Sequence, residues 1–278
     1  MAAEHTIRRI LVAVDASAAS VAALEAAVSL ASDLDAELVG LFVEDVNLVR
    51  LAELPAAQQV RLISARAQPL DRDHVAQTLR GQAARARRAL QAAADEADVP
   101  TEFHVVRGQV TAAVLAAAAE ADLVILGRRA RPLTRRHRLG STARAALTAV
   151  PRSLMLVRPR PISQRPVLVT FDGSPLSWRA LRKAAALAQA THRLQVLLIT
   201  EVPAQAAKWQ AEVADWLEAR TQQASYRQLP RATLAQLVTA VQRAKGDVLI
   251  IGSERLPVPA ETAVRLLAVL DCSLMLIR

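Results

Sequence analysis

Residues 10–17 read Ile-Leu-Val-Ala-Val-Asp-Ala-Ser, an apolar run that ends in Asp-x-Ser and leads into an alanine-rich helical pattern. A run that is apolar throughout, rather than alternating with polar residues, predicts a strand buried on both faces. Such strands belong to parallel sheets between two layers of helices. The same pattern returns at residues 167–174 as Val-Leu-Val-Thr-Phe-Asp-Gly-Ser. These two stretches therefore predict two units of one α/β fold.

Two later segments repeat in the same order. Residues 122–127, Asp-Leu-Val-Ile-Leu-Gly, match residues 247–252, and residues 153–158, Ser-Leu-Met-Leu-Val-Arg, match residues 273–278. Ordered matches whose separation shrinks along the chain indicate a duplication followed by deletions in the second copy. The join falls near Pro159-Arg160-Pro161, because two prolines interrupt regular structure. We expect two domains, 1–160 and 161–278.

In the first copy, short β-branched runs alternate with helical stretches along the chain. We expect strands near 8–14, 37–43, 102–107, 122–127 and 153–158, and helices near 17–34, 71–97, 109–120 and 141–149. The second copy follows the same plan in fewer residues. The predicted fold class is α/β, with two tandem Rossmann-like open parallel sheets and helices on both faces. Asp122 and Asp247, which precede strands, are expected to cap the preceding turns.

The fifth strands, near 154–157 and 274–277, are apolar and would leave exposed edges that invite aggregation. We expect them to pair with each other across a pseudo-two-fold axis, so that one chain imitates a dimer. Whether two chains associate into a homodimer is left open.

Composition restricts the function classes. Hydrophobic residues make up 53% of the 278 residues and charged residues 22%, which predicts packed cores rather than disorder. The formal charge of +9 favours phosphates in general. Aromatic residues are only 3%, which argues against base-stacking platforms. The single cysteine, Cys272, excludes an intramolecular disulfide. No signal segment or membrane-length apolar stretch is found, so we expect a cytoplasmic protein without membrane contact.

Two segments that follow strand ends are candidates for a ligand site. Asp15 follows the first strand, and Gly127-Arg128-Arg129-Ala130 follows the fourth. Nine residues later, Gly140-Ser141-Thr142 opens a helix. Glycines allow a phosphate to approach the backbone, and a helix N-terminus presents free amide hydrogens. The pattern predicts an anion site at the carboxyl edge of the sheet.

The chain resembles the universal stress protein family in its tandem-domain form. The likeness covers nearly the whole chain and is carried by residues 10–17, 39–44, 123–141 and 151–158. The nucleotide-binding branch of that family carries Gly-x2-Gly-x9-Gly-Ser/Thr. This chain matches it at Gly127, Gly140 and Ser141, with Ala130 in place of the middle glycine.

The resemblance implies a five-stranded sheet in the order 3-2-1-4-5, of the adenine nucleotide alpha hydrolase type. It implies ATP in the crevice, with Mg²⁺ as an optional companion. Asp15 would lie on the ribose and metal side, and Val43 would meet adenine through its backbone. The ligand-binding set implied for this chain is Asp15, Val43, Gly127, Arg128, Ala130, Gly140, Ser141 and Thr142, without a catalytic residue or a protein metal site.

Ala130 has two possible effects. If the position needs a positive φ, alanine costs about 1 kcal/mol or more. If the family's glycine serves close approach, the methyl group occupies ligand space instead. The second copy departs further, because Ala260-Glu261-Thr262 replaces Gly140-Ser141-Thr142 and puts an acidic side chain where phosphate would go. We expect no ATP in the second copy.

Two functions remain in view. The first is a nucleotide-responsive stress-response protein, a binding switch with slow ATP hydrolysis at most, because no general base is placed for turnover. The alternative is a nucleotide-independent interaction protein whose arginine-rich loop, 128–138, binds an acidic protein partner. Nucleic acid is disfavoured because no recognition helix accompanies the arginines. An adenylating ligase is a distant third, since its Ser-Gly-Gly-x-Asp-Ser signature is absent.

Overall fold

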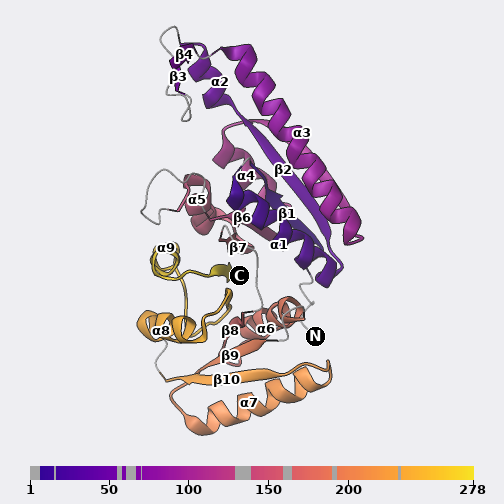
Figure 1. The fold of residues 1–278 in the computed structure, drawn as a ribbon. Helices are drawn as coiled ribbons and strands as arrows, with labels where there is room; N and C mark the ends of the chain where they lie inside the picture. The colour runs from indigo at the N-terminus through magenta and orange to yellow at the C-terminus, as the bar shows by residue number, and fades with distance from the viewer. Residues whose placement is uncertain are drawn as a thin grey trace.

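The computed structural model describes residues 7–15, 17–54, 58–60, 67–69, 71–128, 139–158, 165–189, 193–230 and 233–278 (Figure 1). Its strands are β1 (Arg9–Ala13), β2 (Glu37–Asp45), β3 (Gln58–Val60), β4 (Ala67–Pro69), β5 (Thr101–Gly108), β6 (Leu123–Gly127), β7 (Ser153–Val157), β8 (Val167–Phe171), β9 (Leu194–Ile199), β10 (Ala224–Leu229), β11 (Val248–Ile251) and β12 (Ser273–Leu276). Its helices are α1 (Ala18–Leu34), α2 (Val46–Ala52), α3 (Arg72–Glu96), α4 (Val110–Ala118), α5 (Ser141–Ala149), α6 (Pro175–Ala188), α7 (Pro203–Glu218), α8 (Leu234–Ala244) and α9 (Ala260–Val269).

Ten of these strands form one sheet in the order β10-β9-β8-β11-β12-β7-β6-β1-β2-β5. Each half therefore has the predicted order 3-2-1-4-5, and its neighbouring strands are parallel. The helices α1, α3, α6 and α7 cover one face of the sheet, and α4, α5, α8 and α9 cover the other. The predicted α/β fold is confirmed. The division at residue 160 stays a prediction, because residues 159–164 lie outside the described part.

The two halves meet through their fifth strands. β7 and β12 pair antiparallel, with Met155 opposite Met275 at the centre of the pair. This pairing, which the apolar edges predicted, makes one continuous sheet out of the two sheets expected from the sequence. Both strands are fully buried as a result.

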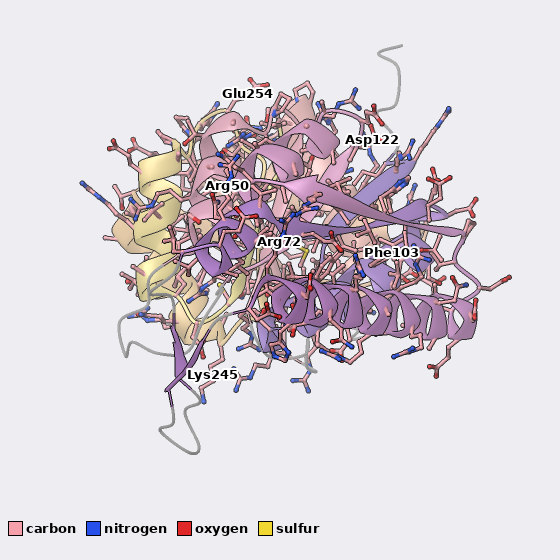
Figure 2. The ribbon with its side chains drawn as sticks, turned by 90° about the horizontal axis from the view of Figure 1, so that it is seen from above. Arg50, Arg72, Phe103, Asp122, Lys245 and Glu254 are labelled. Carbon is pink, nitrogen blue, oxygen red and sulfur yellow. The ribbon has the colours of Figure 1, made fainter. Side chains whose placement is uncertain are left out.

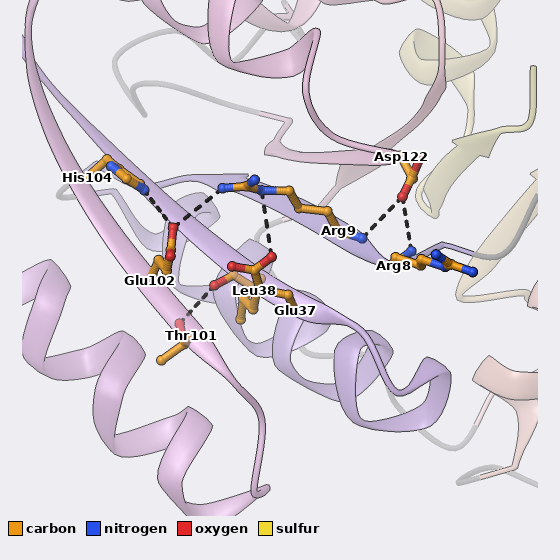
Figure 3. Close-up of polar contacts among 8 residues, drawn as sticks. All are labelled: Arg8, Arg9, Glu37, Leu38, Thr101, Glu102, His104 and Asp122. Carbon is orange, nitrogen blue, oxygen red and sulfur yellow. Dashed lines mark hydrogen bonds and ion pairs between the residues drawn. The ribbon is translucent and has the colours of Figure 1, made fainter.

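At the far end of the sheet, β5 is an exposed edge strand. Its Phe103 faces the long helix α3 (Figure 2), where the guanidinium of Arg87 lies 5.3 Å from the ring centroid. Glu102 on the same strand accepts a hydrogen bond from Arg9 of β1 and contacts the ring of His104 (Figure 3). Paired polar groups thus line the first part of this edge, whereas Val105 and Val106 farther along the strand are exposed.

The described partners of Asp122 lie outside the preceding turn, so the expected capping role is wrong for Asp122, whereas for Asp247 it stays a prediction. One oxygen of Asp122, Oδ2, accepts hydrogen bonds from the backbone amides of Arg8 and Arg9 and so ties β6 to the start of β1 (Figure 3). Asp247 is fully buried and forms an ion pair with Arg158 of the other half. Arg158 also donates to the backbone oxygen of Asp271 at 3.1 Å. These carboxylates join segments that are distant in sequence.

Three elements were not expected from the sequence: α2, β3 and β4. They lie in the connection between β2 and α3, where β3 and β4 form a separate antiparallel pair. Within the described residues, no helix is long and apolar enough to cross a bilayer.

The Arg158–Asp247 ion pair yields a stability prediction. Asp247→Ala leaves a guanidinium buried between the halves without its carboxylate, so the free energy of unfolding should fall by about 3–5 kcal/mol. Urea denaturation at pH 7, followed by circular dichroism, measures the change. Arg152→Ala is the matched control, because it removes the half-exposed partner of Asp122 and should cost under about 1 kcal/mol. Equal losses for the two variants would contradict the assignment.

Candidate functional site

A hollow of about 850 Å³ opens at the carboxyl ends of β1, β2 and β6. Six of the predicted ligand residues line it, namely Asp15, Val43, Gly127, Gly140, Ser141 and Thr142. Ala130 lies outside the described residues. The hollow therefore sits where an open parallel sheet is expected to bind ligands, between strand ends and helix N-termini.

Asp15 stands at the end of β1 in a turn that holds its carboxylate outward. Its Oδ1 accepts a hydrogen bond from the amide of Ser17 at 2.8 Å, and its own amide donates to Ser20 Oγ at 2.7 Å. Ser17 in turn caps α1 by accepting from the amide of Ser20. Among the described residues Oδ2 of Asp15 has no hydrogen-bond partner. That oxygen can therefore accept a hydrogen bond from a ligand or bind a cation.

The end of β2 and the short helix α2 form another wall. Val43 is half-buried on this wall, and Asp45 caps α2 by accepting from the amide of Asn47 at 2.9 Å. α2 packs on α3 through a small apolar cluster that includes Val49 and Leu79. Arg72 of α3 also pairs with Glu53 at 3.3 Å, and Figure 2 shows Arg72 next to α2. The sequence analysis predicted Val43 on this wall but not the helix α2.

A sequence signal for α2 was present. Asp45 is a good N-cap residue, and Val49 and Ala52 follow at the spacing of one helix face. The signal is short, because seven residues give only two turns.

The opposite wall is the N-terminus of α5. Gly140 is its N-cap, with φ −61° and ψ 155°, a conformation that any residue adopts. Among the described residues no side-chain hydrogen bond caps this helix end, and the first amides of a helix have no partner within it. Thr142 Oγ1 lies 3.2 Å from Thr111 Oγ1 at the start of α4. The wall offers amide hydrogens and hydroxyls to an anion.

Gly127 has a packing role that needs no ligand. A Cβ on this residue would lie 2.8 Å from the backbone carbon and oxygen of Ala19 in α1. Gly252 is constrained in the same way, since its Cβ would lie 2.6 Å from Ala180 Cβ and 2.9 Å from the oxygen of Leu176 in α6. The glycine after the fourth strand is therefore required by the helix that follows the first strand, in both halves.

Arg128 does not line the hollow. Its side chain is buried and donates to the carbonyl oxygens of Leu270 at 3.0 Å and Cys272 at 2.9 Å, both in the second half. Its backbone amide donates to Val157 at 2.7 Å. The expectation that Arg128 surrounds a phosphate is corrected to a contact between the halves.

Charge in the described lining is negative. Asp15 and Asp45 are its ionisable side chains, and the described lining contains no lysine, arginine or histidine. In the part of the chain that the structure describes, no group of three or more His, Cys, Asp or Glu side chains could hold a metal ion. An anion in the hollow would therefore be held by backbone amides and hydroxyls of these residues.

The second half has no equivalent arrangement at Asp172, which corresponds to Asp15. Asp172 is buried, and its oxygens accept hydrogen bonds from the amide and hydroxyl of Ser174, from Ser253 Oγ and from the amide of Arg255. Burial acts to raise the pKa of Asp172, but these hydrogen bonds outweigh it and hold the pKa below its ordinary value. The loop after β11 is thus latched over the end of β8.

An aromatic ring completes the closure. Gly173 has φ +78°, and a Cβ there would lie 2.6 Å from Nε1 of Trp209 in α7. Trp209 also packs edge-on against Phe171, and the Arg255 guanidinium lies 5.5 Å from its ring centroid. Trp209 comes close because α7 begins only a few residues after β9, whereas the first half inserts α2, β3 and β4 there.

Comparison with solved structures supports the fold over the full chain. A universal stress protein from Archaeoglobus fulgidus DSM 4304 aligns with a TM-score of 0.67 at 15% identity, over 97% of this chain and 98% of that one. One from Pseudomonas aeruginosa UCBPP-PA14, described as putative, gives 0.57 at 16% identity, over 98% and 94%. A protein of unknown function from Pseudomonas aeruginosa PAO1 gives 0.53 at 15% identity, over 98% and 93%. At these identities the likeness concerns the fold alone.

Among curated proteins, none matches the chain. The model of the universal stress protein family matches residues 6–158, which include every residue predicted for the ligand site. The match spans more than half of the sequence, and its fold is the one found in both halves. The chain belongs to the universal stress protein family.

Proposed function

We propose that this protein is a nucleotide-binding regulatory protein of the stress response, with one ATP site in its first half. One observation carries the proposal: the hollow brings Asp15 and the uncapped N-terminus of α5 together across the ends of β1 and β6. The Asp15 carboxylate can accept hydrogen bonds from ribose hydroxyls on one side of the hollow. The N-terminus of α5 can bind the phosphates on the other side.

The described residues fit such a ligand. The volume lies within the range of small-molecule pockets, about 300–1,000 Å³. Val43, Leu48 and Leu79 provide an apolar wall for a base, and the amides of Ser141 and Thr142 face the phosphate side. Mg²⁺ prefers carboxylate and phosphate oxygens, so Asp15 would share the ion with the phosphates. Among the ionisable side chains of the described lining, Asp15 is assigned to the ligand and Asp45 caps α2, so neither is left as a general base and we infer binding with slow hydrolysis at most.

The second half is proposed to bind no nucleotide. The carboxylate that matches Asp15 is used by the latch, and Trp209 lies against Gly173. Glu261 also adds negative charge to the first turn of α9. The second half then serves as a scaffold. The proposed division into domains 1–160 and 161–278 thus separates a half that binds nucleotide from a half that does not.

The alternative is an interaction protein that binds an acidic partner without nucleotide. The negative described lining favours it, because a polyphosphate would meet two carboxylates and no described cation. Because its side chain contacts the second half, Arg128 is not among the arginines of the 128–138 loop that would bind such a partner. The partner and the homodimer remain predictions under either function.

Gly140→Asp separates the two functions. An aspartate at the N-cap should stabilise α5 while placing a negative charge where phosphate would bind. We expect the melting temperature to hold or rise and the Kd for Mg-ATP to increase at least about tenfold, which corresponds to about 1.4 kcal/mol. Isothermal titration calorimetry measures the affinity.

Two controls isolate the cause. Gly140→Asn caps the helix without a charge, and Pro259→Asp places the same charge at the N-cap of α9 in the second half. Both should bind Mg-ATP more tightly than Gly140→Asp does, and Pro259→Asp should match the unmodified protein. A protein that gives no heat at millimolar Mg-ATP, and that releases no nucleotide on denaturation, would exclude the ATP site.

Asp172→Asn tests the latch of the second half. The carboxylate has a lowered pKa in the folded state, so its stabilisation is present above the ordinary value of 3.8 and is lost as pH falls through the folded pKa. The variant should therefore be less stable by about 1–3 kcal/mol at pH 7, and the difference should shrink below pH 3.8. Urea denaturation across this pH range measures it, and Mg-ATP affinity should not change. If the stability difference between the variant and the unmodified protein did not change with pH, the ionised Asp172 carboxylate would not be what stabilises the second half.

A further inference from the structure

The helix that opens onto the hollow is held at its other end by the second half. Arg278, which follows β12, donates hydrogen bonds from its guanidinium to the carbonyl oxygens of Leu147 and Val150. Val150 is the C-cap of α5. The last carbonyls of a helix lack partners within it, and a cation there is favoured by the helix dipole. Figure 1 shows the end of the chain beside β7, close to α5.

The end of β6 is also attached to the second half. Gly127 lines the hollow, and the next residue, Arg128, donates to Leu270 and Cys272. Leu270 is the C-cap of α9. The two contacts are reciprocal, since each half supplies an arginine that caps the C-terminal end of the other half's helix.

The reciprocal contacts have unequal consequences. The N-terminus of α5 faces the hollow without a capping side chain, whereas α9 starts at Pro259 in the half whose strand end is latched. α5 has nine residues, or a length of about 13 Å, so a tilt at its C-terminal end moves its first amides. Anion binding depends on where those amides point, because misplaced donors lose most of their hydrogen-bond strength.

We propose that Arg278 and Arg128 are positioning residues through which the second half sets the nucleotide affinity of the first. They do not touch the ligand; Arg278 fixes the axis of α5, and Arg128 fixes the end of β6 at Gly127, which lines the hollow. The inference rests on the proposed function, since it concerns the affinity of that same hollow. It gives the closed second half a role beyond completing the sheet.

Arg278→Ala and Arg128→Ala test the proposal by calorimetry with Mg-ATP. We expect the Kd to rise about tenfold for each variant. Arg278→Lys keeps a cation at the helix end and should recover part of the affinity, and it also serves where the alanine variant does not fold. Hydrogen exchange without ATP should become faster at the amides of residues 144–149 in Arg278→Ala, because the hydrogen bonds of α5 protect these amides and the helix is no longer held.

The matched control for Arg278→Ala is Arg158→Lys, which weakens a different contact between the halves, the one to Asp247 and Asp271. It should lower the melting temperature while leaving the Kd and the exchange at 144–149 unchanged. An equal rise in Kd for the control would mean general loosening and would overturn the proposal. Unchanged Kd values for both alanine variants would also overturn it.

Failure of the nucleotide site can be told apart from failure of this inference. If the unmodified protein binds no Mg-ATP, the proposed function fails, and the exchange experiment alone decides the positioning role. Faster exchange at 144–149 in Arg278→Ala, but not in Arg158→Lys, would then support it. Unchanged exchange in Arg278→Ala would overturn it.

Discussion

The antiparallel pairing of β7 with β12 is the interaction on which the rest of the structure depends. Without it, each half would present a fully apolar edge strand to solvent, a template for pairing with other chains. With it, ten strands share one hydrogen-bonded sheet, and two helices from each half cover each face. The pairing also brings the residues after each fifth strand into the opposite half. The buried Arg158–Asp247 pair and the contacts of Arg278 exist only because the strands run side by side.

The two halves share a strand order but differ where their strands end. In the first half, the connection from β2 to α3 contains α2 and the β3–β4 pair, and α2 stands beside the hollow as a wall. In the second half α7 follows β9 almost directly, and its Trp209 packs over Gly173 and Phe171. Because the connection from β9 to α7 contains no helix like α2, α7 places the Trp209 ring near the end of β8. The latch at Asp172 completes the closure with four hydrogen bonds.

The sequence predicted the elements whose signals are local. Apolar runs identified the strands, their repeated order predicted the duplication, and the apolar edges of the fifth strands predicted that these strands pair. α2 escaped because two turns carry little periodicity, and β3 and β4 are three residues each. The roles of Asp122, Asp247 and Arg128 could not be predicted for a different reason. Their partners lie between 89 and 142 residues away in sequence, and only the assembled sheet brings them together.

Comparison of the two halves separates packing from ligand chemistry. Gly127 and Gly252 occupy matching positions, and both are required by the helix that packs against them, so this glycine says little about phosphate. Gly140 has an ordinary backbone conformation, and the matching segment of the second half, Pro259-Ala260-Glu261, contains no glycine. A residue that is free to differ between two copies of one fold is not needed by that fold. The case for a ligand in the first half therefore rests on Gly140 and Asp15, whose surroundings differ between the halves, and not on the glycine that both halves share.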